Sequence, residues 1–204
     1  MTRIVLGPFN RVEGDLEVSL DVEAGQVAAA RINSPLFRGF EQLLVGRVPE
    51  DALTIVPRIC GICSVSQSAT AAAALAELAG VTPPPNGILA QHLVMATENL
   101  ADHLTHFYLF FMPDFARAEY AGRAWHSDIA ARFTAIKGSA ASPALQARAR
   151  FFNLTGFLAG RWPHTLALQP GGSTKAMTPA ERIRILALLR EFRGFLETVL
   201  LGDT

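Results

Sequence analysis

The first 34 residues carry the apolar patterns of β-strands. Residues 3–6 and 16–22 alternate between apolar and polar positions or run continuously apolar, which is typical of short strands. Glu23-Ala24-Gly25-Gln26 has the composition of a tight turn, and residues 27–32 are apolar again. The pattern predicts a small antiparallel β element at the start of the chain.

After Ser34-Pro35 the spacing of apolar residues becomes helical. On residues 86–112, apolar side chains recur every three or four positions, which predicts one long helix with an apolar stripe: Leu89, Leu93, Ala96, Leu100, Leu104 and Phe107. Ser64 and Gln67 have the spacing of a capping box, and Gly80 follows that helix. The other helices are predicted at 40–45, 51–56, 64–79, 115–136, 145–158 and 180–201. We therefore expect an α+β fold, predominantly helical, in which 1–34 form the β element and 35–204 form long packed helices of one region.

Composition excludes several classes of protein. The 204 residues contain 18 basic and 18 acidic side chains, so the zero net charge gives no sign of nucleic-acid binding. Half of the residues are hydrophobic and only 18% are charged, which argues against disorder. Charged or His residues interrupt every apolar run before the roughly 18 residues that a membrane span needs. Acidic residues near the N-terminus are unlike a signal peptide, and two cysteines three apart favour a reduced, cytoplasmic protein.

The strongest chemical signal is Arg58-Ile59-Cys60-Gly61-Ile62-Cys63. Two thiols separated by two residues can point toward one soft metal ion. Gly61 suits a turn that needs an unusual backbone angle, and Arg58 is expected to favour thiolates. Redox chemistry of the pair and simple packing of two cysteines remain alternatives. A four-thiolate site needs two further cysteines that this chain lacks.

Two acidic residues lie in distinctive segments. Glu13, in Arg11-Val12-Glu13-Gly14, is a carboxylate beside a glycine that could relay protons, although a solvated turn has the same composition. Glu41, in 37–41 (FRGFE), has apolar neighbours, and a half-buried carboxylate there would pair with an arginine or bind a hard cation. Each segment alone is ambiguous.

Taken in order, the segments RVEG, FRGFE and RICGIC, followed by an Ala-rich helix, resemble the N-terminal half of the large subunit of nickel–iron hydrogenases. The stretches DHLTHFYLFFMPDF at 102–115 and WPHTLALQPGG at 162–172 extend the resemblance over nearly the whole chain. It implies H2 splitting at a Ni-Fe(CN)2(CO) centre. It also implies an iron–sulfur small subunit as partner.

The resemblance implies a role for each matched residue. Cys60 and Cys63 fall on two nickel ligands, and Cys63 would bridge nickel to iron. Glu13 falls on the residue that passes protons away from the centre, and Glu41 falls on a ligand of Mg²⁺. The family supplies the other two cysteines near the C-terminus of a longer subunit. We therefore expect a fragment, a truncated product or one piece of a split subunit, whose missing C-terminal part is a partner.

Four departures from the common pattern resemble the hydrogen-sensing, regulatory branch of the family. Asp15 and Gln67 replace histidines, and Ile62 and Phe110 are bulkier than the valine and leucine usual along the gas channel. Ordinary packing explains Ile62 and Phe110 equally simply. The branch implies H2 sensing and a signalling histidine kinase as a further partner.

Other functions stay open. A non-catalytic paralogue that serves as a scaffold for assembly of the iron–cyanide group would also resemble the large subunit. The related quinone-side subunit of respiratory complex I lacks the cysteines, so Cys60 and Cys63 argue against it. His103 and His106, near Glu98 and Asp102, could belong to a di-iron site, but no second helix carries the matching Glu-x-x-His pattern.

Overall fold

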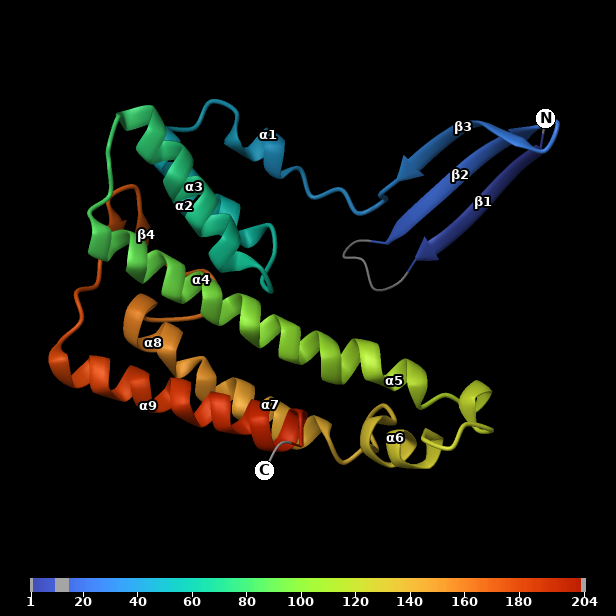
Figure 1. Ribbon diagram of the computed structural model, residues 1–204. Coiled ribbons are helices and arrows are strands. Elements are labelled where there is room, and N and C mark those ends of the chain that lie inside the picture. Colours follow the sequence, from blue (N-terminus) through green and yellow to red (C-terminus); the bar gives the residue numbers. More distant parts are fainter. Residues whose placement is uncertain (1, 10–14, 203–204) are drawn as a thin grey trace. The chain divides into compact units, whose positions relative to one another are not determined.

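The computed structural model describes residues 2–9 and 15–202. The chain divides into two compact units, Met1–Leu43 and Leu44–Thr204 (Figure 1). The predicted α+β, predominantly helical fold is confirmed: the first unit contains a small antiparallel sheet, and the second is almost entirely helical.

The sheet of the first unit has the order β1 (Thr2–Phe9), β2 (Leu16–Glu23), β3 (Gln26–Asn33). Ala24 and Gly25, which join β2 to β3, both have positive φ, as a two-residue hairpin turn requires, so the predicted turn is confirmed. Leu20 pairs with Ile4 on one side and Ala30 on the other, which places these apolar side chains on one face.

The opposite face of the sheet carries a buried carboxylate, Asp21. Arg3 donates to it at 2.8 Å, and Arg31 donates to it from the third strand. The hydrogen bonds from Arg3 and then Arg31 lower the pKa of Asp21 to about 2. The three side chains hold all three strands in register from one face.

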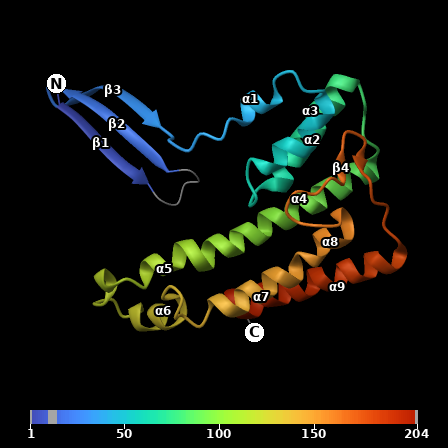
Figure 2. The same cartoon turned by 180° about the vertical axis from the view of Figure 1, so that it is seen from behind.

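In the second unit, α4 (Pro85–Thr105) is the central helix. Figures 1 and 2 show it beside α7 (Ala141–Phe151) and α8 (Asn153–Ala159), and it also packs against α3 (Ser64–Ala79). The helix α9 (Pro179–Phe195) packs on α7 and α8. Shorter elements are α1 (Phe40–Leu44), η1 (Pro49–Asp51), α2 (Ala52–Ile55), η2 (Val56–Arg58), η3 (His106–Phe111), α5 (Met112–Phe115), η4 (Ala118–Tyr120), α6 (His126–Phe133), β4 (Leu168–Gln169), β5 (Gly172–Ser173) and η5 (Leu196–Leu200).

The buried face of α4 differs from the predicted apolar stripe. Leu89 and Leu100 are exposed, by 58% and 43%, and the residues that face the core are Ala90, Val94, Thr97, Glu98, Ala101 and Leu104. Polar residues can occupy the buried face because their hydrogen bonds are made; the Thr97 hydroxyl, for example, donates to the Leu93 carbonyl at 2.8 Å. The core-facing side therefore coincides with only part of the predicted stripe: Leu104 is buried and Leu93 and Phe107 pack against the core, whereas Leu89, Ala96 and Leu100 are exposed.

Two predicted helices are divided in the structure. Residues 115–136 form η4 and α6 rather than one helix, with turns around Gly122 between them. Residues 145–158 lie in α7 and α8, which meet at Phe152. At the end of α4, the aromatic-rich η3 is a π-helical turn, a local widening of the helix.

A short hairpin, β4–β5, lies against the start of α4. A Cβ added to Gly172, whose φ is 116°, would lie 2.6 Å from Cα of Gly87, so these two backbones touch directly. The amide of Gln91 donates to the carbonyls of Gln169 and Gly172 at 3.1 and 2.8 Å. The glycines and the amide fix residues 168–173 on α4.

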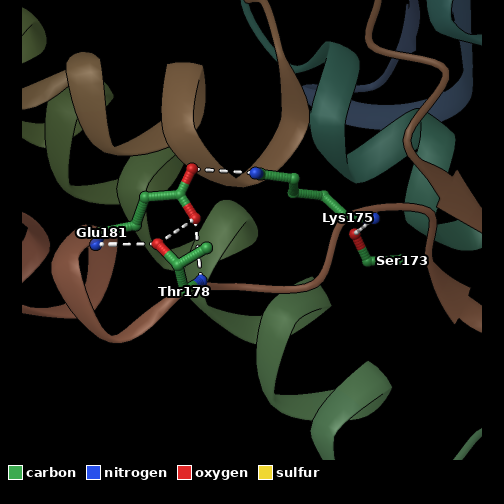
Figure 3. Close-up of polar contacts among 4 residues, drawn as sticks. All are labelled: Ser173, Lys175, Thr178 and Glu181. Atoms are coloured by element: carbon green, nitrogen blue, oxygen red, sulfur yellow. Dashed lines mark hydrogen bonds and ion pairs between the residues drawn. The ribbon is translucent and has the colours of Figure 1, made fainter.

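The helix α9 begins with a complete capping box (Figure 3). The Thr178 hydroxyl accepts from the Glu181 amide at 3.2 Å, and the Glu181 carboxylate accepts from the Thr178 amide at 2.8 Å. Lys175 also donates to Glu181 at 2.8 Å. The predicted C-terminal helix after Pro179 is confirmed, with this cap setting its first turn.

Candidate metal centre

The two cysteines occupy the turn between η2 and α3, in the second unit. Cys63 is the N-cap of α3, and its backbone amide donates to Sγ of Cys60 at 3.3 Å. The amide of Gln67, one turn into the helix, donates to Sγ of Cys63 at 3.8 Å. Both thiols are half-buried and free. The turn thus brings two soft donors together at a helix start, as the spacing predicts.

Two details of the prediction for this turn are wrong. Gly61 does not have positive φ, and a Cβ there would meet nothing within 4 Å, so the turn does not require a glycine. The pKa of the Cys63 thiol is raised rather than lowered, first by burial and then by the neighbouring Cys60 thiol, although the Gln67 amide opposes both. Arg58 donates to the Thr54 carbonyl, so its guanidinium is engaged with the backbone.

The predicted capping box of α3 is also replaced by another arrangement. Ser64 is the first residue of the helix rather than its cap, and Gln67 contacts a thiol. A carboxylate from another helix, Glu98 of α4, accepts from the Val65 and Ser66 amides at 2.9 and 3.1 Å. Sequence reasoning missed this role; an acidic residue on the core-facing side of α4 was the available signal.

The turn at 162–164 completes the surroundings of the thiols. Nε1 of Trp162 donates to Glu98 at 2.8 Å, and the His164 amide donates to the Ser64 hydroxyl at 3.2 Å. Nδ1 of His164 lies 3.0 Å from the Pro57 carbonyl, just before the RICGIC segment. The indole of Trp162 stacks on Phe152 with centroids 4.4 Å apart. Segments far apart in sequence therefore meet at the cysteine turn.

The remaining predicted residues are distributed over the chain. Ile62 lies between the cysteines with 55% of its side chain exposed, and Phe110 lies in η3 with 45% exposed, stacked on His106. Glu41 lies in α1 and is exposed rather than half-buried, because this short helix contributes no buried residue. Glu13 lies outside the described residues. The structure therefore brings together the cysteines and Gln67, and it leaves the roles of Glu13 and Glu41 as predictions.

The donor set at the cysteine turn fits half of a soft-metal site. Two thiolates on one turn suit nickel, iron or zinc, each of which needs further ligands. Among residues 2–9 and 15–202, no three His, Cys, Asp or Glu side chains are arranged to hold a metal ion. No such arrangement within the described part of the chain includes His103 or His106, so the di-iron alternative gains no support. The fold and the paired thiols define a predominantly helical protein with two free thiols on one turn.

Comparison with known proteins identifies this class more closely. The sequence profile described as nickel-dependent hydrogenase matches residues 38–141, which is half of the chain. The large subunit of the periplasmic [NiFeSe] hydrogenase of Desulfomicrobium baculatum is 30% identical over 95% of this chain and 40% of its own length. The vhu F420-non-reducing hydrogenase of Methanocaldococcus jannaschii has a subunit that is 30% identical over 91% of this chain and 44% of its own length.

Solved structures agree with these sequence matches. The reduced Ni-Fe-Se hydrogenase of D. vulgaris Hildenborough superposes with a TM-score of 0.76 at 32% identity, over 98% of this chain and 43% of that one. The chain belongs to the nickel-dependent hydrogenase family and matches the N-terminal part of its large subunit. It spans about two fifths of the length of these relatives.

The comparisons do not support three of the finer predictions. The two relatives named above are a periplasmic and a methanogen hydrogenase, and neither name indicates a hydrogen sensor or an assembly scaffold. One of them is periplasmic, so the predicted cytoplasmic location gains no support. Within the described residues, each helix is too short or too polar to cross a membrane.

Proposed function

We propose that this chain supplies two thiolate ligands, Cys60 and Cys63, to the nickel–iron centre of a hydrogenase that acts on H2. One observation carries the proposal: a chain of the nickel-dependent hydrogenase family places two free, half-buried thiols on one turn at the start of α3. When bound, a Ni-Fe(CN)2(CO) centre would supply the heterolytic cleavage of H2.

The residues of the chain would have separate tasks at this site. Cys60 and Cys63 would hold the metal centre, because thiolate sulfurs are suited to soft metals such as nickel and iron. The Glu13 carboxylate accepts the proton released from H2 and passes it on. Glu41 binds Mg²⁺, a hard cation that prefers carboxylate oxygens. Ile62 and Phe110 narrow the passage by which gas reaches the site.

Two partners complete the proposed enzyme. An iron–sulfur small subunit would carry the electrons away, and a further polypeptide segment would provide the remaining metal ligands. Several apolar side chains of α9 and η5 are exposed, including Ile183, Leu186 and Val199. They form a surface that one of these two partners could cover.

Hydrogen sensing, with a histidine kinase as a further partner, is the finer form of this proposal. It rests on Asp15, Gln67, Ile62 and Phe110. The contact between the Gln67 amide and the Cys63 sulfur supports a role for one of these residues at the proposed site. Binding and splitting of H2 are common to both forms.

The proton-transfer role is tested by Glu13→Gln in the assembled hydrogenase. This change keeps the shape of the side chain and removes its titratable group, so H2/D2 exchange with solvent should collapse. Nickel content should be unchanged. Glu23→Gln, at the exposed end of β2, is the matched control and should exchange normally. Normal solvent exchange in Glu13→Gln would assign the proton to another residue.

A further inference from the structure

Glu98 is a buried carboxylate on the central helix α4. Its side chain is 2% exposed, and no Lys, Arg or His forms an ion pair with it in the described part of the chain. A buried charge is costly unless hydrogen bonds compensate for it. Its donors are the Ser64 hydroxyl at 3.4 Å, the Val65 amide at 2.9 Å, the Ser66 amide at 3.1 Å and the Trp162 indole at 2.8 Å.

Three of these donors, on Ser64, Val65 and Ser66, belong to the segment that follows the cysteines directly. Val65 and Ser66 lie in the first turn of α3, where backbone amides have no acceptor within the helix. The side chain at an N-cap normally accepts from them, but Cys63 makes no such bond in the described structure. Glu98, which lies on the neighbouring helix α4, accepts from these amides in place of an N-cap side chain. The positive end of the α3 dipole attracts a negatively charged group at this position.

The same network reaches the other end of the cysteine turn. The Ser64 hydroxyl accepts from the His164 amide, and the His164 ring contacts the Pro57 carbonyl at 3.0 Å. The chain is thus anchored before Arg58 and after Cys63. Between the anchors, Gly61 and Ile62 are exposed.

We propose that Glu98 is a positioning residue, which holds the start of α3, and with it Cys63, in the arrangement that metal binding requires. The proposal rests on the function proposed above, in which the two thiols bind metal. A site whose ligands are already in place loses less conformational entropy on binding. Supporting groups of this kind commonly change metal affinity 10- to 100-fold when they are altered.

The test uses the 204-residue chain with Glu98→Gln. The glutamine keeps one acceptor oxygen but presents an NH2 group at the other position, where only donors converge, so the bonds to Ser66 or to Trp162 should fail. Amide hydrogen exchange in the first turn of α3 should become at least about tenfold faster, while exchange within α9 stays slow. Cadmium is the probe, titrated through its thiolate charge-transfer absorption, and its affinity should fall about tenfold or more. Glu77→Gln, on the exposed side of α3, should change neither measurement.

Other results of these two measurements would contradict either the positioning role of Glu98 or the proposed metal-binding function. Faster exchange with unchanged cadmium affinity would make Glu98 a helix cap only and would overturn the positioning role. If Glu98→Gln unfolds the chain, Trp162→Phe removes one donor and keeps the stacked ring. That variant should lose a smaller part of the cadmium affinity with its core intact, and unchanged affinity overturns the proposal. Two other outcomes would contradict the proposed metal-binding function instead. One is cadmium binding that persists when both Cys60 and Cys63 are changed to serine, and the other is the absence of cadmium binding by the unchanged chain.

Discussion

A stacked pair of aromatic rings joins α9 to α7. Phe192 stacks on Phe151 with ring centroids 3.9 Å apart and planes inclined by 12°. Phe192 is 6% exposed, and Phe151 is 2% exposed. We therefore expect Phe192→Ala to be among the most destabilising single changes in α9.

The magnitude follows from the buried ring and its surroundings. Removing a buried phenylalanine side chain usually lowers the free energy of unfolding by about 3–5 kcal/mol. Phe192 also lines an open groove of about 280 Å³ between α7 and α9, together with Leu188 and Phe195. Water and these neighbours can fill part of the space left by the ring, so the loss should lie at about 3–4 kcal/mol. For a chain of this size that lowers Tm by roughly 6–16 °C.

Urea unfolding followed by far-ultraviolet circular dichroism measures this difference. Ile183→Ala is the matched control, because Ile183 lies on the same helix with 67% of its side chain exposed. Its free energy of unfolding should change by less than about 0.5 kcal/mol, apart from a small change in helix propensity. A loss below about 1 kcal/mol in Phe192→Ala would refute the described docking of α9 on α7.

Two further predictions concern the helix cap and the gas passage. The hydrogen bond from Lys175, followed by those from Thr178, lowers the pKa of Glu181 to about 2. The ionised carboxylate therefore stabilises the fold when the pH is above the ordinary pKa of the group. This stabilisation is lost as the pH falls from about 4.5 toward 2. The Tm of Glu181→Gln should therefore fall less steeply over that acid range than the Tm of the unchanged chain, and parallel curves would contradict the cap. In the assembled hydrogenase, Ile62→Val with Phe110→Leu should make the centre inactivate faster after timed O2 exposure, with H2 turnover little changed, because smaller side chains widen a passage shared by both gases. Both side chains are about half exposed, so the stability cost should stay below about 1 kcal/mol, and equal O2 resistance would make these residues ordinary surface packing.

Local features of the fold were predictable where one short segment determines the backbone. The Ala24-Gly25 turn and the start of α9 at Pro179 follow from neighbouring residues alone. Gly80 also ends α3 with a φ of 65°, as its place after the helical pattern predicts. These signals act over a few residues, so they do not depend on the rest of the fold.

Features that depend on tertiary contacts were not predictable in the same way. The core-facing side of α4 includes Glu98, because amides of α3 and the Trp162 indole compensate for its charge. Residues 98 and 162 are far apart in sequence, and nothing in the local pattern connects them. The cysteine pair was recognisable from its spacing, whereas the groups that hold it in place required the structure.

The most direct test of the central claim is the nickel content of the 204-residue chain after dialysis against a chelator. Because the chain has only two cysteines, nickel should be removed nearly completely from the chain alone. It should be retained when a polypeptide that carries the remaining ligands is supplied, and Cys60→Ser or Cys63→Ser should abolish that retention. One nickel per chain held by the 204 residues alone, with infrared bands of cyanide and carbon monoxide, would contradict the account, as would retention that is indifferent to both cysteines.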